Sequence, residues 1–376
     1  MAQWASMLGV WSRRVEAILA ASTRALRETS TGTVAIAALA AVGLVWGLYQ
    51  AARAVPRDEN TQRRLRVLIT GGTRGLGAAM ARKFAALGDD VAVAARRRAP
   101  LSIPTVFSNQ KIVALQCDIT RPSEVEELGL QVVRDLGSVD LWINNAGASQ
   151  SAKEPLWRTP VKDINAVLST NAGSIVYGSR MALRVLQNNE LGGALVNIDG
   201  AGSSGMTTPN FATYGYTKAG VPQLAATLNA ELQRAAAGSL SHSSKAALQR
   251  IGVHTASPGM VVTDLLMGGV DFSPQGCKTR RVFNILAESP DTVAAWLVPR
   301  LRGLVTSNRR YVAGSAEDME VELTGPPRRG EYLRYLTPAG VVWRFASSLF
   351  WSTRGRLVPE SKPGSTGGKS EHAKQQ

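Results

Sequence analysis

The sequence predicts a doubly wound α/β fold, in which helices cover both faces of a parallel sheet. Three observations support it. Short apolar runs typical of buried strands alternate with helical runs. A glycine-rich turn joins the first of these strands to the first helix. A later helix, which also follows a strand and a glycine turn, opens with a Tyr-x-x-x-Lys pair. The 376 residues leave room for one large domain with appendages.

The first 65 residues precede this domain. Residues 1–30 contain four arginines, two acids and several alanines and serines, a composition typical of an organelle targeting segment or of an amphipathic helix on a membrane surface. Residues 31–55 include the uncharged run Thr33–Ala52, which as a helix of 20 residues would be about 30 Å long. We interpret it as a transmembrane helix; a buried helix or part of a long targeting signal are the alternatives. Residues 56–65 form a polar, basic linker.

Composition narrows the function classes. The net charge of +15 is compatible with a solvated basic surface, an anionic cofactor or an anionic membrane surface. Zinc-finger spacing and aromatic-basic platforms are absent from the sequence, which argues against nucleic acid as a partner. Two cysteines, Cys117 and Cys277, cannot build a disulfide framework and suit a reducing compartment. The three histidines lack metal-ligand spacing, so we expect no metal site.

A glycine loop follows the first predicted strand, Arg66–Thr70, and precedes a helical run over 78–87. Unpaired N–H groups at the start of a helix point at an anion, and glycines let the backbone approach a pyrophosphate closely. The loop therefore predicts a dinucleotide site, with an ordinary strand-to-helix turn as the alternative. The residues assigned to this contact are Gly71, Thr73, Arg74, Gly75, Leu76 and Gly77.

Arginines end the second predicted strand, residues 91–95. Arg96, Arg97 and Arg98 stand where an NAD site usually has an acid for the ribose 2′-hydroxyl, and arginine there accommodates a 2′-phosphate. The cofactor predicted from this pattern is NADPH, although Arg97 and Arg98 also suit a solvated face. Between this strand and the third, residues 112–116, two prolines interrupt the expected crossover helix. Asp118 follows the third strand, where it either meets the adenine or stabilises a turn.

The fourth strand, residues 140–143, ends in two amides and two small residues. Asn145, Ala146 and Gly147 can let the backbone approach a flat ring at the carboxyl edge of the sheet, where ligands of open α/β sheets bind. A helix over 123–136 precedes this strand. Asn171 lies within the helix that follows it, where asparagine is unfavourable, so its amide either bonds locally or has a task near the active centre.

The fifth strand, residues 194–198, leads through glycines to a helix over 212–237 that carries Tyr214 and Lys218. Side chains four residues apart share a helix face. The ammonium favours an ionised phenol, so we expect the pKa of Tyr214 to fall from about 10 toward the working pH. Such a phenol can protonate a developing alkoxide. The pair alone occurs by chance in many chains, and its value depends on the preceding strand and glycines.

The remaining segments complete the domain and its extension. A serine-rich loop is expected over 238–245 and a strand over 251–256, in which His254 is more consistent with the core than with catalysis. Pro258, Gly259 and Thr263 follow this strand and can cover a nicotinamide. Helical segments at 282–287 and 292–301 complete a domain spanning 66–312, and a charged loop is expected over 314–330. The extension, 313–358, includes an apolar, aromatic segment at 340–351, interpreted as an interfacial helix or substrate lid, or as packing against the domain; residues 359–376 form a disordered tail.

Together, the glycine loop, Asn144–Gly147, Asn171, Tyr214-x-x-x-Lys218 and Pro258-Gly259 resemble the short-chain dehydrogenase/reductase superfamily over about 65–304. The resemblance implies a Rossmann fold with a central sheet of about seven strands. It also implies that Tyr214 is the general acid/base, that Lys218 holds the nicotinamide ribose and that Asn171 orders a relay water. The superfamily's serine usually lies 13 residues before the tyrosine, at Ala201 here. We assign its role to Ser203; a backbone N–H or Tyr214 alone are the alternatives.

Three segments, 197–209, 254–269 and 283–300, resemble the chlorophyll(ide) b reductases of chloroplasts. This resemblance implies NADPH-dependent reduction of the 7-formyl group of chlorophyll(ide) b to 7-hydroxymethyl, in chlorophyll b degradation and the chlorophyll cycle. It also implies a thylakoid membrane location with a stromal catalytic domain, and light-harvesting complexes or a homologous reductase subunit as partners. The alternatives are a membrane-attached reductase of a lipid, retinoid or steroid carbonyl, and a non-enzymatic NADP(H)-binding subunit of a pigment-protein complex.

Overall fold

The computed structural model describes residues 64–97, 103–238, 242–268, 277–306, 309–311, 321–323 and 329–337, and single positions beyond. The chain divides into two units, Met1–Arg57 and Asp58–Gln376, and all described residues lie in the second. The predicted targeting segment, transmembrane helix and tail, and most of 340–351, lie outside the described residues. Among the helices that are described, none has the length and apolar character needed to cross a bilayer.

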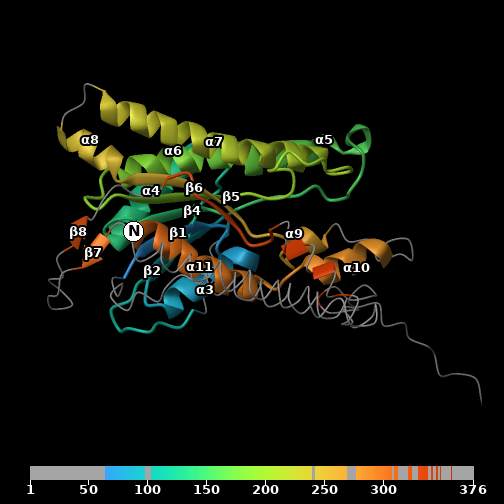
Figure 1. The fold of residues 1–376 in the computed structure, drawn as a ribbon, viewed down its shortest axis with the longest axis horizontal. Coiled ribbons are helices and arrows are strands. Elements are labelled where there is room, and N and C mark those ends of the chain that lie inside the picture. The colour runs from blue at the N-terminus through green and yellow to red at the C-terminus, as the bar shows by residue number, and fades with distance from the viewer. Residues whose placement is uncertain are drawn as a thin grey trace, which may run out of the picture. The chain divides into compact units, whose positions relative to one another are not determined.

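Seven parallel strands form the central sheet, in the order β3-β2-β1-β4-β5-β6-β9 (Figure 1). The order reverses direction beside β1, as in a doubly wound sheet, so the predicted fold class and strand number are confirmed. The strands are β1 (Arg66–Thr70), β2 (Asp90–Ala95), β3 (Ile112–Gln116), β4 (Leu141–Asn144), β5 (Gly193–Ile198), β6 (Ile251–Ser257) and β9 (Tyr332–Arg334). A separate antiparallel pair joins β7 (Arg309–Tyr311) to β8 (Val321–Leu323).

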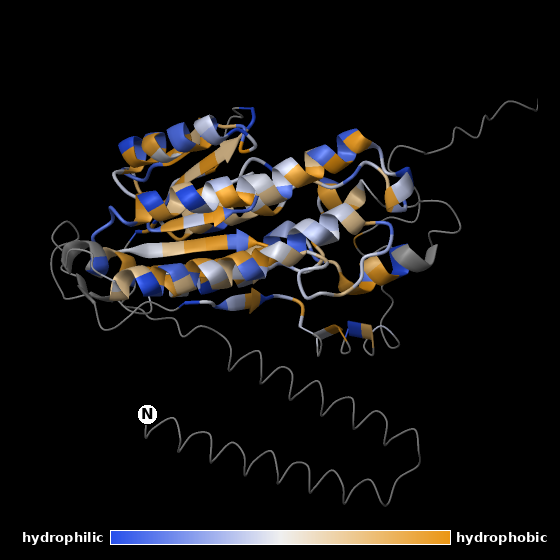
Figure 2. Ribbon diagram, turned by 90° about the horizontal axis from the view of Figure 1, so that it is seen from above, coloured by the Kyte–Doolittle hydropathy of each residue, from blue (hydrophilic) through white to orange (hydrophobic). Residues whose placement is uncertain are grey.

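Helices cover both faces of the sheet. α3 (Gly75–Ala86) and α11 (Pro290–Thr306) pack on one face, and α4 (Pro122–Leu136), α6 (Ser174–Leu186) and α7 (Ala212–Ala237) pack on the other. Figure 2 shows largely hydrophobic strands between helices of mixed character. The remaining helices are the 3-10 turn η1 (Leu156–Arg158), α5 (Val161–Leu168), the π-helical turn η2 (Ser169–Gly173), α8 (His242–Gln249), α9 (Asp264–Met267) and α10 (Cys277–Leu286).

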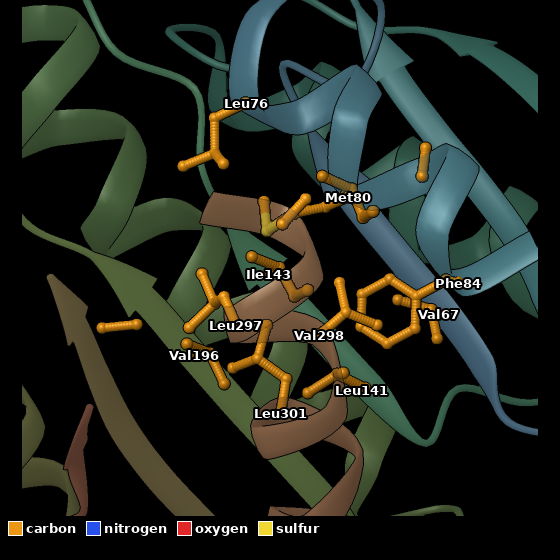
Figure 3. Packing of buried hydrophobic residues seen from close by; sticks show 14 of the residues in the cluster. Val67, Leu76, Met80, Phe84, Leu141, Ile143, Val196, Leu297, Val298 and Leu301 are labelled. Atoms are coloured by element: carbon orange, nitrogen blue, oxygen red, sulfur yellow. The ribbon is translucent and has the colours of Figure 1, made fainter. Parts of the chain in front are cut away.

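The packing of α3 fixes the start of that helix against the sheet. Met80 and Phe84 of α3 and Leu297 of α11 are fully buried over the strands (Figure 3). Because full burial of one such side chain stabilises the fold by about 1.5–3 kcal/mol, this layer holds α3 firmly. The glycine loop between β1 and α3 therefore has two rigid ends.

In agreement with the two prolines, no helix forms within 103–111, where the Gln110 amide donates to the backbone oxygens of Ala85 and Asp89, at 2.9 and 2.7 Å. Three local expectations need correction. The loop expected over 238–245 is interrupted by α8, which begins at His242, and that over 314–330 contains β8. The seventh strand, β9, comes from the segment after residue 312, where no strand was expected. Its three residues are too few to show a pattern, and its pairing with β6 is a tertiary effect.

Candidate active site

The glycine loop forms a compact anion cradle. Arg74 is the N-cap of α3 but makes no side-chain cap, and the first turn contains no acid, so its N–H groups remain available to an anion. Gly71 and Gly75 have φ values of +66° and +55°, which favour glycine. A Cβ on Gly77 would lie 2.3 Å from the Gly71 oxygen. These features fit a pyrophosphate. The other predicted residues, Thr73 and Leu76, lie in the same loop, Leu76 with its side chain in the core.

The segment after β6 lies over this cradle. A Cβ on Gly75 would meet the Thr263 Cγ2 at 3.1 Å. The Arg74 guanidinium donates to the Asp264 carboxylate at 3.0 Å, and both side chains are exposed. Pro258 and Gly259 form the preceding turn, in which Gly259 has φ +71°. The structure thus brings Thr263 to the glycine loop, as a residue that covers a bound cofactor requires.

The cationic end of β2 lies near Asp118. Arg96 and Arg97 are exposed. Burial raises the pKa of Asp118, but hydrogen bonds from Thr120 and the charges of Arg121 and Arg96 outweigh it and hold the pKa below its ordinary value. The Asp118 carboxylate accepts from the Thr120 N–H at 3.0 Å and hydroxyl at 2.7 Å, which is the turn-stabilising alternative. Two exposed arginines therefore stand at the carboxyl end of β2.

The backbone after β4 is tied to β1. The Thr70 hydroxyl accepts from the Asn145 and Ala146 N–H groups at 3.1 and 3.2 Å. The Asn145 amide donates to the backbone oxygen of Thr70 at 2.9 Å and to that of Gly71 at 3.3 Å. A Cβ on Gly147 would meet only the Asn171 Oδ1 at 3.6 Å and the Asn145 oxygen at 4.0 Å. Gly147 therefore borders space that a flat ring can approach.

Asn171 sits in the π-helical turn η2 and is fully buried. Its Oδ1 accepts from the Ala148 N–H at 2.8 Å, and its Nδ2 donates to the Ala148 oxygen at 2.9 Å and to the Thr217 hydroxyl at 3.3 Å. The Asn171 amide thus bonds to neighbouring groups, the first of the two roles considered for it from the sequence. It also joins the loop after β4 to α7, the helix that carries Tyr214.

Tyr214 and Lys218 are buried together on α7, with 7% and 3% of their surfaces exposed. The Lys218 ammonium donates to the Ile198 oxygen at 3.1 Å and lies 5.7 Å from the centre of the Tyr214 ring. Burial lowers the pKa of Lys218 to about 8. Burial, reinforced by the charge of Asp199, raises the pKa of Tyr214 above its ordinary value. The expected fall in this pKa is wrong, because desolvation and the charge of Asp199 both raise it; the phenol is protonated at neutral pH and can act as an acid.

Gly200, rather than Ala201, faces this phenol. A Cβ on Gly200 would lie 2.3 Å from the Tyr214 Oη, so the backbone of this residue lies against the phenol. The Ser203 Oγ lies 3.0 Å from the Tyr332 Oη.

Sequence reasoning missed Asp199 and Tyr332, whose hydroxyl donates to the Asp199 carboxylate. An acid at the end of a buried strand is a signal that could have identified Asp199, which is 3% exposed. The sequence gives no signal for Tyr332, because this residue reaches Asp199 only when β9 pairs with the sheet.

An aromatic wall lies beside Tyr214. The Phe211 ring stacks on the Tyr214 ring, with centroids 4.4 Å apart and planes 25° apart. The Lys153 ammonium lies 5.6 Å from the centre of the Phe211 ring and 5.1 Å from that of Phe283. Burial lowers the pKa of Lys153. Phe283 is itself buried, so the half-buried Phe211 is the ring of this wall that a flat, apolar substrate can contact.

The sequence profile of the short chain dehydrogenase family matches residues 66–271. The Arabidopsis thaliana protein named "Probable chlorophyll(ide) b reductase NYC1, chloroplastic" is 34% identical over 334 residues, 84% of this chain and 58% of that protein. This chain therefore spans little more than half of that relative. "Chlorophyll(ide) b reductase NOL, chloroplastic" of Oryza sativa subsp. japonica is 35% identical over 322 residues, 82% of this chain and 84% of that protein.

The fold is also that of a solved structure, a short chain dehydrogenase from Burkholderia cenocepacia J2315 in complex with NADP. The two chains are 24% identical, with a TM-score of 0.54, and the similarity covers 74% of this chain and 100% of that one.

Proposed function

Because the chain belongs to the short-chain dehydrogenase family, and is therefore an oxidoreductase, we propose that it reduces the 7-formyl group of chlorophyll(ide) b to 7-hydroxymethyl with NADPH. One observation carries this choice of substrate. The relatives at 34–36% identity, which match 64–84% of this chain, are named chlorophyll(ide) b reductases. The Phe211 ring, which stacks on the Tyr214 ring, supports a flat, apolar substrate.

The cofactor site favours NADPH. The first turn of α3 and the glycine loop would hold its pyrophosphate, since Gly71, Gly75 and Gly77 leave the backbone accessible. Arg74 and Arg96 would hold the 2′-phosphate; both side chains are exposed, and Arg74 would then exchange its ion pair with Asp264 for the phosphate. Asn145, Ala146, Gly147, Pro258, Gly259 and Thr263 would line the remainder of the site, Asp118 would meet the adenine, and Lys218 would hold the nicotinamide ribose.

The proposed chemistry assigns the proton to Tyr214. When bound, NADPH supplies a hydride to the formyl carbon. The Tyr214 hydroxyl, protonated because burial raises its pKa, donates a hydrogen bond and then its proton to the formyl oxygen. Lys218 stabilises the phenolate that remains. Asn171 fixes α7 to the loop after β4, and the stacked Phe211 ring holds the Tyr214 ring in place.

The setting of the enzyme is part of the proposal. The related chlorophyll(ide) b reductases are named chloroplastic, and we place this chain in the chloroplast, at the thylakoid membrane, with its catalytic domain in the stroma. Light-harvesting complexes or a homologous reductase subunit are the partners we propose. The apolar, membrane-dissolved character of chlorophyll b supports this location.

The test is reduction of chlorophyll b by the purified full-length protein with NADPH, and with NADH for comparison. We expect a 7-hydroxymethyl product with NADPH. Tyr214→Phe should lower kcat by about 100-fold or more while NADPH affinity stays unchanged, because one proton donor is lost. Tyr216→Phe is the matched control, since Tyr216 lies on the same helix and is 73% exposed. Unchanged pigment together with reduction of a lipid, retinoid or steroid carbonyl would refute the proposed substrate; full function of Tyr214→Phe would refute the catalytic role.

A further inference from the structure

One exposed ion pair joins the glycine loop to the segment that follows β6. The Arg74 guanidinium donates to the Asp264 carboxylate at 3.0 Å, although the two residues are 190 positions apart in the chain. Both side chains face solvent, with 74% and 81% of their surfaces exposed. Within the part of the chain that the structure describes, neither residue has a second ion pair. An anion from solution can therefore reach this pair and exchange with one of its members.

The backbone fixes the place of Asp264 beside the glycine loop. Thr263, the residue before it, packs against the loop, since a Cβ on Gly75 would lie 3.1 Å from the Thr263 Cγ2. The segment is anchored one residue earlier, where the Val262 N–H donates to the Glu288 oxygen at 2.9 Å. Asp264 is the first residue of α9. Its carboxylate thus starts from a defined point next to the anion cradle.

Arg74 has a second partner in the proposed function. It is the N-cap of α3, but its side chain does not cap the helix, and with NADPH bound it would contact the 2′-phosphate. A guanidinium pairs well with either a carboxylate or a phosphate. Sharing Arg74 between both would bring two negative groups into close proximity, which their repulsion opposes. The carboxylate and the 2′-phosphate therefore compete for the same donors.

The strengths of the two contacts decide the outcome of this competition. An ion pair between two exposed side chains is weak, because solvent screens it and two long side chains must be ordered. A phosphate monoester carries up to two negative charges at neutral pH and attracts a guanidinium more strongly. Asp264 should therefore weaken the binding of the 2′-phosphate without preventing it. NADH has no such phosphate and leaves the pair intact.

We propose that Asp264 is a specificity-determining residue that competes with the 2′-phosphate of NADPH for Arg74, and so lowers the preference of the enzyme for NADPH over NADH. The inference rests on the cofactor assignment in the proposed function and is independent of the pigment. The competition weakens NADP+ and NADPH in the same proportion, because both carry the phosphate. Asp264 thus favours departure of the oxidised cofactor after each turnover.

The first test is a fluorescence titration of the full-length protein with NADPH and with NADH. Asp264→Asn keeps the size of the side chain and removes its charge. The dissociation constant for NADPH should fall by about two- to fivefold, the range expected from one exposed ion pair, and that for NADH should stay unchanged. Asp291→Asn is the matched control, because Asp291 forms another exposed pair, with Arg82 of α3 at 2.7 Å, and should change neither constant.

Three further measurements separate competition from other roles of Asp264. Arg74→Ala should weaken NADPH binding by about 10-fold or more, because a charged hydrogen-bond donor is lost. Adding Asp264→Asn to that variant should then have no effect on NADPH affinity, since the shared partner is gone. NADP+, measured by displacement of NADPH, should bind Asp264→Asn more tightly by the same factor as NADPH does. At 1 M salt the effect of Asp264→Asn should largely disappear, because exposed charges are screened.

The possible results distinguish this inference from the proposed function. Weaker NADPH binding by Asp264→Asn would mean that the carboxylate orients Arg74 toward the phosphate, and unchanged binding would mean that the two do not compete; either result would overturn the inference alone. Unchanged NADPH affinity in Arg74→Ala would overturn both the inference and the assignment of Arg74 to the cofactor. Failure to form the 7-hydroxymethyl pigment would refute the proposed substrate and leave the binding results, and thus the inference, standing.

Discussion

Replacing Gly77 by alanine tests the glycine loop most directly. The added Cβ would lie 2.3 Å from the Gly71 oxygen and 2.6 Å from the Asn145 Nδ2. Both neighbours must retreat by about 1 Å to reach ordinary contact, and α3 cannot yield because Met80 and Phe84 anchor it in the core. Overpacking of this kind costs about 1–3 kcal/mol. We expect the strain to open the loop by breaking the bonds from Asn145 to β1.

The assay is a fluorescence titration of the full-length protein with NADPH. If the whole cost falls on the bound state, the affinity should drop by about 5- to 150-fold, since 1.4 kcal/mol is tenfold. The matched control is Gly303→Ala on α11, where a Cβ would have no neighbour within 4 Å. That variant should bind NADPH normally and gain about 0.5–1 kcal/mol of stability. Binding by Gly77→Ala within twofold of wild type would refute the reasoning.

Three further predictions concern buried groups. Lys218→Met should be more stable than wild type at pH 7, because burial lowers the pKa of Lys218 from 10.5 to about 8 in the folded protein. The difference in unfolding free energy between the two proteins, measured in urea, should shrink as the pH rises from 8 to 10.5. Arg302→Met should lose about 3–5 kcal/mol at pH 7, because it leaves the buried Asp89 carboxylate without its partner. Burial raises the pKa of Asp89 to about 6 although the charge of Arg302 lowers it, so without Arg302 the carboxyl protonates at a still higher pH and the loss should be smaller at pH 5; an equal loss at pH 7 and pH 5 would contradict this. Gly200→Ala should displace the Tyr214 hydroxyl and lower kcat with the protein still folded, as judged by circular dichroism.

The core of the fold was predictable because its signals are local. β1 and β3 begin and end at the predicted residues, as does α7, since apolar runs with clear breaks mark them. β9 was not predictable, because its three residues are defined by pairing with β6 rather than by their own pattern. α8 was missed because its serine-rich sequence is also typical of a loop.

The candidate site was predictable where a motif fixes the geometry. Gly77 lies beside Asn145, and Thr263 lies beside Gly75, so these segments meet at the predicted glycine loop. The pKa of Tyr214 was not, because spacing gives the position of the ammonium but not the desolvation that dominates. The hydrogen bond between Asp199 and Tyr332 was missed for another reason: the two residues are 133 positions apart along the chain, and no local pattern links them.

The position of β9 has a consequence for biosynthesis. This strand pairs with the edge of β6, yet it follows β6 in the chain only after α9, α10, α11, β7 and β8. The N-terminus of a chain leaves the ribosome first, and domains fold as units during synthesis. Until Tyr332 emerges, β6 has an open edge of the kind that invites wrong pairing between nascent chains. A polypeptide that ended before β9 would therefore keep the edge of β6 unpaired and be prone to association.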